Sequence, residues 1–323
     1  MKAAIVRGAG QTPVYGEFSE PVPSEGESRI AVTAAAISPV VKSRAAGTHY
    51  SSSGQFPFVV GIDGVGRLDD GSRVYFLLPR APYGSMAERT VARSAQCVAL
   101  PGDLDDVTAA AIANPGMSPW VAYTERAKLK AEETVLVNGA TGTAGRLAVQ
   151  IAKHLGAKKV IATGRATGRD ADALKSVVAL GADVTIPLVE DEAALDDRFR
   201  EQFAQRVDVV IDYLWGKSAE RLLIAGAKAG PNGVPIRFVQ IGSVSGSDIT
   251  LPSAVLRSSA IELMGSGIGS IPLDRIVHAI GGLLRATVPG NFEIAAKAVP
   301  LSDFEQAWPR DDSTRRTVFM VAQ

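Results

Sequence analysis

The sequence predicts an α/β protein in which a β-rich domain is followed by a domain built on a doubly wound parallel sheet. The chain of 323 residues exceeds what one hydrophobic core usually serves, so two domains are expected. In residues 1–114, short apolar runs are separated by Gly, Pro and Ser, a pattern typical of strands and loops. In residues 115–266, apolar runs alternate with longer helical patterns, which indicates βαβ units. We expect residues 267–323 to complete the first domain.

Each apolar run is an expected strand. In the first domain these strands are Lys2–Val6, Arg29–Ala34, Arg73–Leu78 and Arg89–Val91. In the second domain they are Thr134–Asn138, Lys159–Thr163, Asp183–Ile186, Val207–Asp212, Arg237–Ile241 and Ile261–Met264. In the C-terminal segment we expect a helix at Asp274–Arg285, followed by strands at Phe292–Val299 and Thr317–Val321.

The composition excludes several classes of partner. Lys plus Arg and Asp plus Glu both number 34, so the basic excess typical of a nucleic-acid binder is missing. Cys97 is the only cysteine, which excludes an intrachain disulfide. No apolar run approaches the roughly 20 residues of a membrane-spanning helix, and the N-terminus has no long apolar targeting segment. We expect a small-molecule partner, no nucleic acid, no membrane and a cytoplasmic location.

The strongest local feature is the segment from Thr134 to Gly156, a buried-type strand that runs into a glycine-rich turn and then into an amphipathic helix. The turn contains Gly139, Gly142 and Gly145. In a dinucleotide-binding turn, backbone N–H groups at the helix N-terminus bind the pyrophosphate, and a side chain would block its approach. We expect Gly142 to contact the cofactor and Gly145 to let helix and strand pack closely. Such triplets also cap ordinary strands, but this position between a strand and a helix favours dinucleotide binding.

The end of the next strand favours NADPH over NADH. In NAD-binding units this strand ends near an acidic residue that holds the ribose 2′-hydroxyl. Here the strand ends before Gly164 and Arg165, with Arg169 one turn beyond and no carboxylate before Asp170. A guanidinium group can bind a 2′-phosphate through two hydrogen bonds. The alternative is that both arginines are solvated residues of a loop.

Further motifs follow one another along nearly the whole chain. They are FPFVVGIDGVGRL (Phe56–Leu68), GSMAERTV (Gly84–Val91), NPGMSPWVAY (Asn114–Tyr123), and then VDVVIDYLWG, FVQIGSVSG and VPLSDFEQAW. With these motifs the chain resembles the medium-chain dehydrogenase/reductase superfamily, specifically its zinc-free quinone-oxidoreductase-like branch. The resemblance implies a GroES-like first domain, a Rossmann cofactor domain and a cleft between them for nicotinamide and substrate. It also implies a homodimer paired through the strand at Ile261–Met264.

The same resemblance implies which residues bind the cofactor. Around the pyrophosphate it places Thr141, Gly142, Thr143, Ala144 and Gly145. At the adenosine ribose phosphate it places Gly164 and Arg165, with Arg169 nearby. The remaining candidates are Asn114 at the nicotinamide end, Asp212 and Tyr213 after the fourth strand, Ile241, Gly242 and Ser243 after the fifth, and Arg316 near the C-terminus. For the residues at strand ends, packing alone is the alternative explanation.

The chain departs from the family at three places. Ser38-Pro39-Val40-Val41 replaces a frequent Asn-Pro-x-Asp, and Arg315-Arg316 replaces a frequent Gly-Lys before the last strand. Gly61-Ile62-Asp63 replaces the Gly-His-Glu that brings a ligand in zinc-dependent relatives. With one cysteine and three histidines in the chain, we expect no metal.

Hydride transfer without a Lewis acid needs an acceptor that is already polarised. The sequence therefore predicts an NADPH-dependent oxidoreductase acting on a quinone or an α,β-unsaturated carbonyl compound. Tyr50 is the candidate proton donor, because resembling enoyl-thioester reductases place a catalytic tyrosine in a Gly-x-Tyr context; the alternative is an aromatic residue at the rim of a Ser-rich loop.

Two other functions stay open. An enoyl-thioester reductase would need a basic entrance for its substrate arm, which Arg44, Arg257, Arg315 and Arg316 could form, although solvated charges explain these residues equally well. A non-catalytic NADPH-binding sensor would keep the cofactor domain and lose the substrate cleft.

Overall fold

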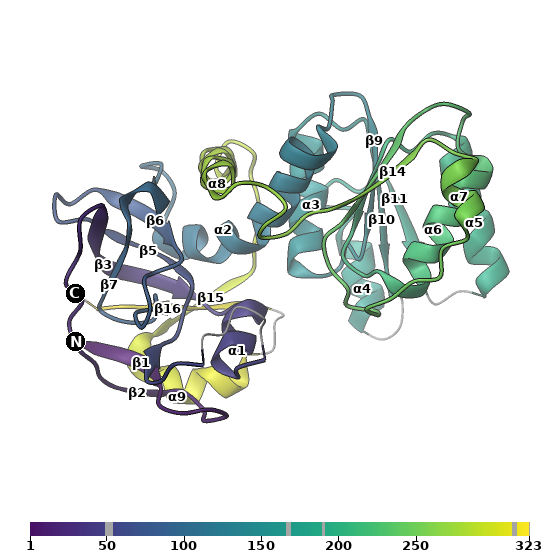
Figure 1. Ribbon diagram of the computed structural model, residues 1–323. Coiled ribbons are helices and arrows are strands. Elements are labelled where there is room, and N and C mark those ends of the chain that lie inside the picture. Colours follow the sequence, from purple (N-terminus) through teal and green to yellow (C-terminus); the bar gives the residue numbers. More distant parts are fainter. Residues whose placement is uncertain (49–53, 166–168, 189–190, 312–314, 323) are drawn as a thin grey trace. The chain divides into compact units, whose positions relative to one another are not determined.

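The computed structural model describes residues 1–48, 54–165, 169–188, 191–311 and 315–322, without the side chains of residues 169–171. The contacts divide the chain into two units (Figure 1). The first unit comprises Met1–Asn114 and Asp274–Gln323, and the second comprises Pro115–Leu273. The assignment of these units as substrate domain and cofactor domain stays a prediction.

The first unit contains two β-sheets. The smaller, antiparallel sheet has the strand order β2 (Val14–Glu17), β1 (Lys2–Val6), β4 (Phe58–Val59). The larger sheet has the order β15 (Ala296–Pro300), β16 (Arg316–Met320), β3 (Glu27–Ala36), β5 (Asp63–Arg67), β6 (Arg73–Leu77), β8 (Cys97–Ala99), and β7 (Arg89–Arg93) also pairs with β3. The long strand β3 therefore joins the C-terminal strands to the N-terminal ones.

Short helices connect these strands. They are α1 (Pro39–Ala45), η1 (Ser94–Gln96), η3 (Leu301–Asp303), α9 (Phe304–Ala307) and η4 (Trp308–Arg310), and the longer α8 (Leu273–Thr287) begins at the boundary between the units. Helix α1 begins after Ser38, whose hydroxyl accepts a hydrogen bond from the Val41 N–H at 3.2 Å, an N-cap that satisfies a free donor of the first turn.

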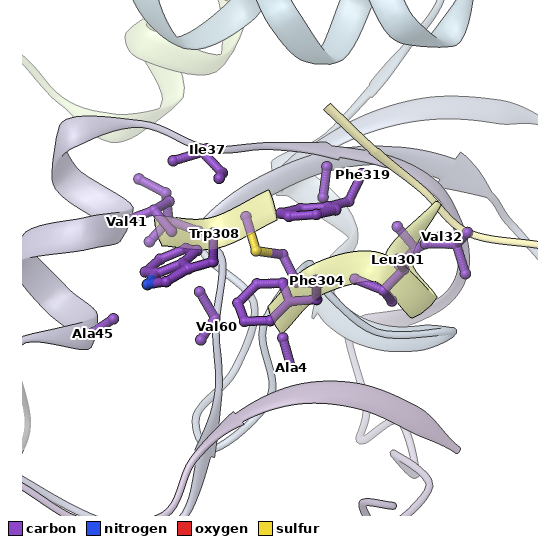
Figure 2. Packing of buried hydrophobic residues seen from close by; sticks show 14 of the residues in the cluster. Ala4, Val32, Ile37, Val41, Ala45, Val60, Leu301, Phe304, Trp308 and Phe319 are labelled. Atoms are coloured by element: carbon purple, nitrogen blue, oxygen red, sulfur yellow. The ribbon is translucent and has the colours of Figure 1, made fainter. Parts of the chain in front are cut away.

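The C-terminal segment supplies much of the core of the first unit (Figure 2). The ring of Phe304 stacks on Trp308 with centroids 5.1 Å apart and packs on Phe319 at 5.0 Å. Ala4 and Val60, from the N-terminal part of the chain, lie in the same cluster. Burying these aromatic side chains stabilises the unit through the apolar area that they remove from water.

The second unit is a six-stranded parallel sheet. Its strand order is β11 (Val184–Pro187), β10 (Lys159–Gly164), β9 (Thr134–Asn138), β12 (Val209–Asp212), β13 (Ile236–Gln240), β14 (Ile261–Gly265). Chain order reverses direction between β9 and β12, which makes this pair the topological switch point of a Rossmann sheet. Because every pairing is parallel, the carboxyl ends of all six strands lie at one edge, which we call the carboxyl edge.

Helices cover both faces of this sheet. Helices α5 (Glu192–Ala204) and α6 (Gly216–Ala229) bury Phe199, Phe203 and Leu222 in one cluster with sheet residues, and α7 (Ser253–Arg257) adds Val255. Helix α3 (Thr143–His154) lies on the opposite face, as Figure 1 shows, and α4 (Arg169–Ser176) lies beside β10 and β11. Two buried faces explain why the strands are continuous apolar runs rather than alternating ones.

Most strand predictions are confirmed, with shifted ends. β9 matches its predicted bounds, and the other five strands of the sheet lie within two residues of theirs. The predicted strand Phe292–Val299 is wrong in its first half, because the strand begins only at Ala296. Helix α2 (Asp106–Val121), with the π-helical turn η2 (Ala122–Ala127) after it, was not among the expected elements. Among the described residues, no helix is long and apolar enough to cross a membrane.

Candidate cofactor-binding site

The glycine-rich turn joins the end of β9 to the start of α3. Every residue of β9 is buried, and the chain leaves the strand at Gly139, whose φ of +91° favours glycine. Gly142 is the N-cap of α3 and the cap has no side-chain hydrogen bond. The first backbone N–H groups of a helix lack intrahelical partners, so they are available to an anion.

The glycines of this region have different structural roles. A Cβ added at Gly145 would overlap the carbonyl oxygen of Gly139 and lie 2.7 Å from Ala140 Cα, so only glycine lets the helix approach the turn. A Cβ added at Gly164 would lie 2.5 Å from Thr141 Cγ2, which makes Gly164 a packing residue as well. A Cβ added at Gly142 would meet nothing within 4 Å. The open backbone of the turn is therefore at Gly142.

A buried hydrogen-bond network holds the turn in place. The Asn138 amide donates to Asp212 Oδ1 at 2.8 Å and to Ser218 Oγ at 2.9 Å, and its oxygen accepts from Thr163 Oγ1 at 2.6 Å. The Gly139 N–H donates to the same Thr163 hydroxyl at 3.1 Å. The network links the ends of β9, β10 and β12, so these strands fix the turn jointly.

Asp212 is a predicted cofactor contact, but in the structure its side chain is bound by groups of the protein itself. Its side chain is fully buried, and Oδ1 accepts from the Asn138 amide and from the Leu214 N–H at 3.0 Å. Burial raises the pKa of this carboxyl group. In the structure its side chain therefore orders the chain after β12, and direct contact with a cofactor stays a prediction.

The loops after β12 and β13 are joined through the backbone. The N–H groups of Ile241 and Gly242 donate to the carbonyl oxygen of Asp212 at 2.8 and 3.2 Å, and Ser243 is exposed in the same loop. The Tyr213 hydroxyl lies 3.5 Å from Ser118 Oγ and 3.4 Å from the carbonyl oxygen of Ala144, at the start of α3. Burial raises the pKa of Tyr213, so this hydroxyl stays protonated.

The structure thus brings most predicted cofactor residues to the carboxyl edge of one unit. These are Thr141, Gly142, Thr143, Ala144, Gly145, Gly164, Arg165, Asp212, Tyr213, Ile241, Gly242 and Ser243. Arg165 is exposed directly after β10. Arg169 begins α4, but its side chain is not described, and Tyr50 lies outside the described residues. Asn114, partly buried in α2, and Arg316 belong to the first unit.

Arg316 lies in a buried polar set that was not expected from the sequence. The Tyr75 hydroxyl donates to Asp63 Oδ2 at 2.8 Å, and Asp63 and Tyr75 both interact electrostatically with the guanidinium of Arg316. Burial raises the pKa of Asp63 to about 6 and lowers the pKa of Arg316. Within the described residues, Arg316 Nε and Nη2 and Asp63 Oδ1 have no hydrogen-bond partner. Strands β5, β6 and β16 bring these groups together, which no local sequence pattern indicates.

Several known proteins resemble the chain. A family model described as zinc-binding dehydrogenase matches residues 144–280. A probable NADPH-dependent quinone reductase of Emericella nidulans is 29% identical over 99% of this chain and 100% of its own length. The crystal structure of the quinone oxidoreductase from Thermus thermophilus, also solved with NADPH, has a TM-score of 0.79 at 25% identity and covers 99% of this chain and 100% of that one. These similarities support the resemblance to quinone oxidoreductases of the medium-chain dehydrogenase/reductase superfamily.

Another relative carries the name of a different reductase. A 2-methylene-furan-3-one reductase of Solanum lycopersicum is 27% identical over 84% of this chain and 72% of its own length. The predicted fold class, a β-rich domain with a Rossmann-type domain, is confirmed.

The matched family model is named for zinc, but the side chains of this chain do not provide the ligands that zinc needs at one point in the described residues. Structural and catalytic zinc sites use Cys, His or carboxylate ligands converging on one point. Over the ranges that the structure describes, no three His, Cys, Asp or Glu side chains are grouped so that they could hold a metal ion. Asp63, at the position of the expected Glu, is instead bound by Tyr75. The described residues do not fit a zinc site.

Proposed function

We propose that this chain is an NADPH-dependent oxidoreductase that reduces quinones or α,β-unsaturated carbonyl compounds without zinc. The observation that carries the proposal is the glycine turn at the switch point of the sheet, where the backbone at Gly142 is open and α3 begins. The superfamily and the Emericella nidulans relative support NADPH as the cofactor.

The residues present fit such a cofactor. The N–H groups at the start of α3 would bind the pyrophosphate, and the network of Asn138 and Thr163 would keep them in place. Arg165, exposed directly after β10, would bind the 2′-phosphate. Arg316, which lies buried beside Asp63 in the first unit, stays a predicted cofactor contact.

The chemistry of the bound cofactor sets the choice of acceptor. When bound, NADPH supplies a hydride; the acceptor takes up this hydride and one proton, so a quinone would become a hydroquinone and an enone a saturated ketone. The protein would contribute position and hydrogen-bond donors rather than a Lewis acid. Tyr50 as the proton donor stays part of this proposal.

Steady-state turnover tests the proposal. We expect NADPH oxidation with at least one benzoquinone, naphthoquinone or α,β-unsaturated ketone, at a rate that a metal chelator does not change. The variant Gly142→Ala tests the site, because a Cβ there meets no protein atom within 4 Å but would hinder the approach of the pyrophosphate. Loss of activity after chelation would contradict the zinc-free reaction, and NADPH binding without turnover on the whole panel would favour the sensor.

The Solanum lycopersicum relative favours conjugated carbonyl compounds as a second substrate class. An enoyl thioester shares the same double bond, so the panel includes a coenzyme A enoyl thioester beside simple enones. A kcat/KM that is at least tenfold higher for the thioester than for the matching enone would support the enoyl-thioester reductase.

A further inference from the structure

A pocket of about 410 Å³ opens on the first unit beside its C-terminal strands. We call it the β15 pocket. Strands β15 and β16 form one wall, and the short helices η3, α9 and η4 form the other. Its volume lies in the range of small-molecule sites. The described lining residues all belong to the first unit, whereas the glycine turn belongs to the second.

The alternation of side chains along β16 gives its two neighbouring arginines different surroundings. Arg316 is buried, whereas Arg315 and Thr317, one residue to either side, line the pocket. In the register of the two parallel strands, Thr317 is paired with Lys297 of β15, which lines the pocket as well. The basic group expected from the sequence is therefore divided. Arg315 lies with Lys297 and with Arg310 of η4, two residues that the sequence pattern did not single out.

The β15 pocket carries an excess of positive charge. Three exposed cations, Lys297, Arg310 and Arg315, line it together with one described carboxylate, Asp303. Over the described ranges, none of the three cations forms an ion pair, with Asp303 or with any other carboxylate. The described lining therefore holds two positive charges that no described group neutralises, and an anionic ligand would neutralise them.

The core of the first unit fixes the position of these cations. Arg310 ends η4, whose Trp308 is stacked on Phe304 with ring centroids 5.1 Å apart (Figure 2). Arg315 Nη2 donates to the carbonyl oxygen of Ala296 at 3.2 Å, which ties this guanidinium to β15. The other N–H groups of Arg315 have no partner in the described part of the chain, so they can donate to a ligand.

The floor of the pocket is apolar. Val299 is buried in the hydrophobic cluster of the first unit, and Ala307 packs against the same cluster. The Gln306 amide at the rim can both donate and accept hydrogen bonds, and no described group occupies it. A bare inorganic anion would neutralise the rim but leave the floor in contact with water. An apolar floor under a cationic rim therefore fits an organic anion best.

We propose that the β15 pocket binds the phosphate ester of a small organic molecule. A phosphate dianion matches the excess of two positive charges, and guanidinium groups such as those of Arg310 and Arg315 bind phosphate oxygens through paired hydrogen bonds. The organic part lies on Val299 and Ala307, and a polar group on it pairs with Gln306. The inference goes beyond the proposed function, which uses none of these residues.

Lysine footprinting locates such a ligand without any nucleotide. The native chain, in phosphate-free buffer, is treated briefly with acetic anhydride in the presence and absence of phenyl phosphate, and mass spectrometry follows the acetylation of Lys297 and Lys228. Lys228, exposed at the end of α6 in the second unit, is the internal control. We expect phenyl phosphate to slow the acetylation of Lys297 at least threefold and to leave that of Lys228 unchanged.

Two matched variants each remove one exposed guanidinium group from the first unit. Arg310→Gln removes it from the pocket, whereas Arg29→Gln removes it from a pair with Asp69 that lies outside the pocket lining. Half-protection of Lys297 should require at least fivefold more phenyl phosphate in Arg310→Gln than in the native chain, and an unchanged concentration in Arg29→Gln. In the native chain, inorganic phosphate should protect Lys297 at least threefold less effectively than phenyl phosphate, because it does not contact the floor.

Three outcomes would overturn the proposal. Equal acetylation of Lys297 with and without phenyl phosphate would show that the pocket does not bind this class of ligand. Protection that survives Arg310→Gln, or that is lost equally in Arg29→Gln, would show a general effect of charge. Equal protection by inorganic phosphate would exclude a role for the apolar floor. Failure of the proposed function leaves this comparison unchanged, because no dinucleotide is present, and phenyl phosphate bound at the glycine turn instead would leave Lys297 reactive.

Discussion

Gly142 and Gly145 lie one helical turn apart, and the structure predicts opposite consequences for the same substitution. Gly142→Ala places a methyl group in open space at a φ of −73°, so we expect the free energy of unfolding to change by less than about 1 kcal/mol. The same methyl group narrows the approach of the pyrophosphate, and we expect the NADPH dissociation constant to rise at least tenfold. Gly145→Ala overlaps backbone atoms of Gly139 and Ala140, and should cost about 1–3 kcal/mol.

Urea unfolding and NADPH titration of both variants measure these effects. A Gly142→Ala protein that unfolds as readily as Gly145→Ala, or that binds NADPH like the native chain, would contradict the roles given to the two glycines.

Asp63 makes the stability of the first unit depend on pH. Burial raises its pKa from 3.8 to about 6 in the folded chain, so the folded state holds a proton more tightly than the unfolded state. The resulting stabilisation is fully present below pH 3.8 and is lost as the pH rises through about 6. The difference corresponds to roughly 3 kcal/mol as an upper limit.

The free energy of unfolding at about pH 4.5 and 7.5, compared between the native chain and Asp63→Asn, isolates this effect from the other carboxyl groups. We expect the native chain to gain stability at the lower pH relative to the variant. An equal pH dependence in both proteins would show that Asp63 is ionised throughout.

At the scale of elements, Asn138 ties three strand ends to the glycine turn. Asn138→Ala removes the donor of Asp212 and the acceptor of Thr163, both buried, and should cost about 1–3 kcal/mol. The Thr163 hydroxyl also accepts a hydrogen bond from the Gly139 N–H. Without Asn138 the glycine turn is therefore held less firmly, and the NADPH affinity should fall as well. The control is Ser218→Ala, which removes only one partner of the Asn138 amide. This variant should lose less stability and less NADPH affinity than Asn138→Ala. Unfolding and NADPH titration that rank the two variants in the reverse order would contradict the network.

The parallel sheet was predictable from the sequence because its strands are buried on both faces and read as continuous apolar runs. Helix α2 was not predictable from the sequence. Pro115 and Pro119 lie inside this helix, and its apolar residues lie on all sides rather than on one face, so neither helical signal is present. The glycine turn was predictable because its chemistry is local. The set of Asp63, Tyr75 and Arg316 and the three cations of the β15 pocket depend on tertiary structure, so no spacing along the chain indicates them.

At the scale of the whole molecule, β14 is an edge strand of its sheet, and the predicted homodimer would pair there. Leu263 on this strand is 39% exposed, so a partner could cover it. We expect light scattering to give twice the chain mass of 33.7 kDa for the native chain and the mass of one chain for Leu263→Arg. A native mass of one chain would contradict the dimer.

The central claim, an NADPH site that opens at Gly142 and ends at Arg165, is tested most directly by titrating NADPH and NADH into the native chain, Arg165→Ala and the control Arg200→Ala. Arg200 lies on α5 and pairs with Asp197, so its removal should leave the site unchanged. We predict that NADPH binds at least tenfold more tightly than NADH, about 1.4 kcal/mol, and that only Arg165→Ala removes this difference. Failure of both nucleotides to bind the native chain, or a preference that survives in Arg165→Ala, would contradict the account.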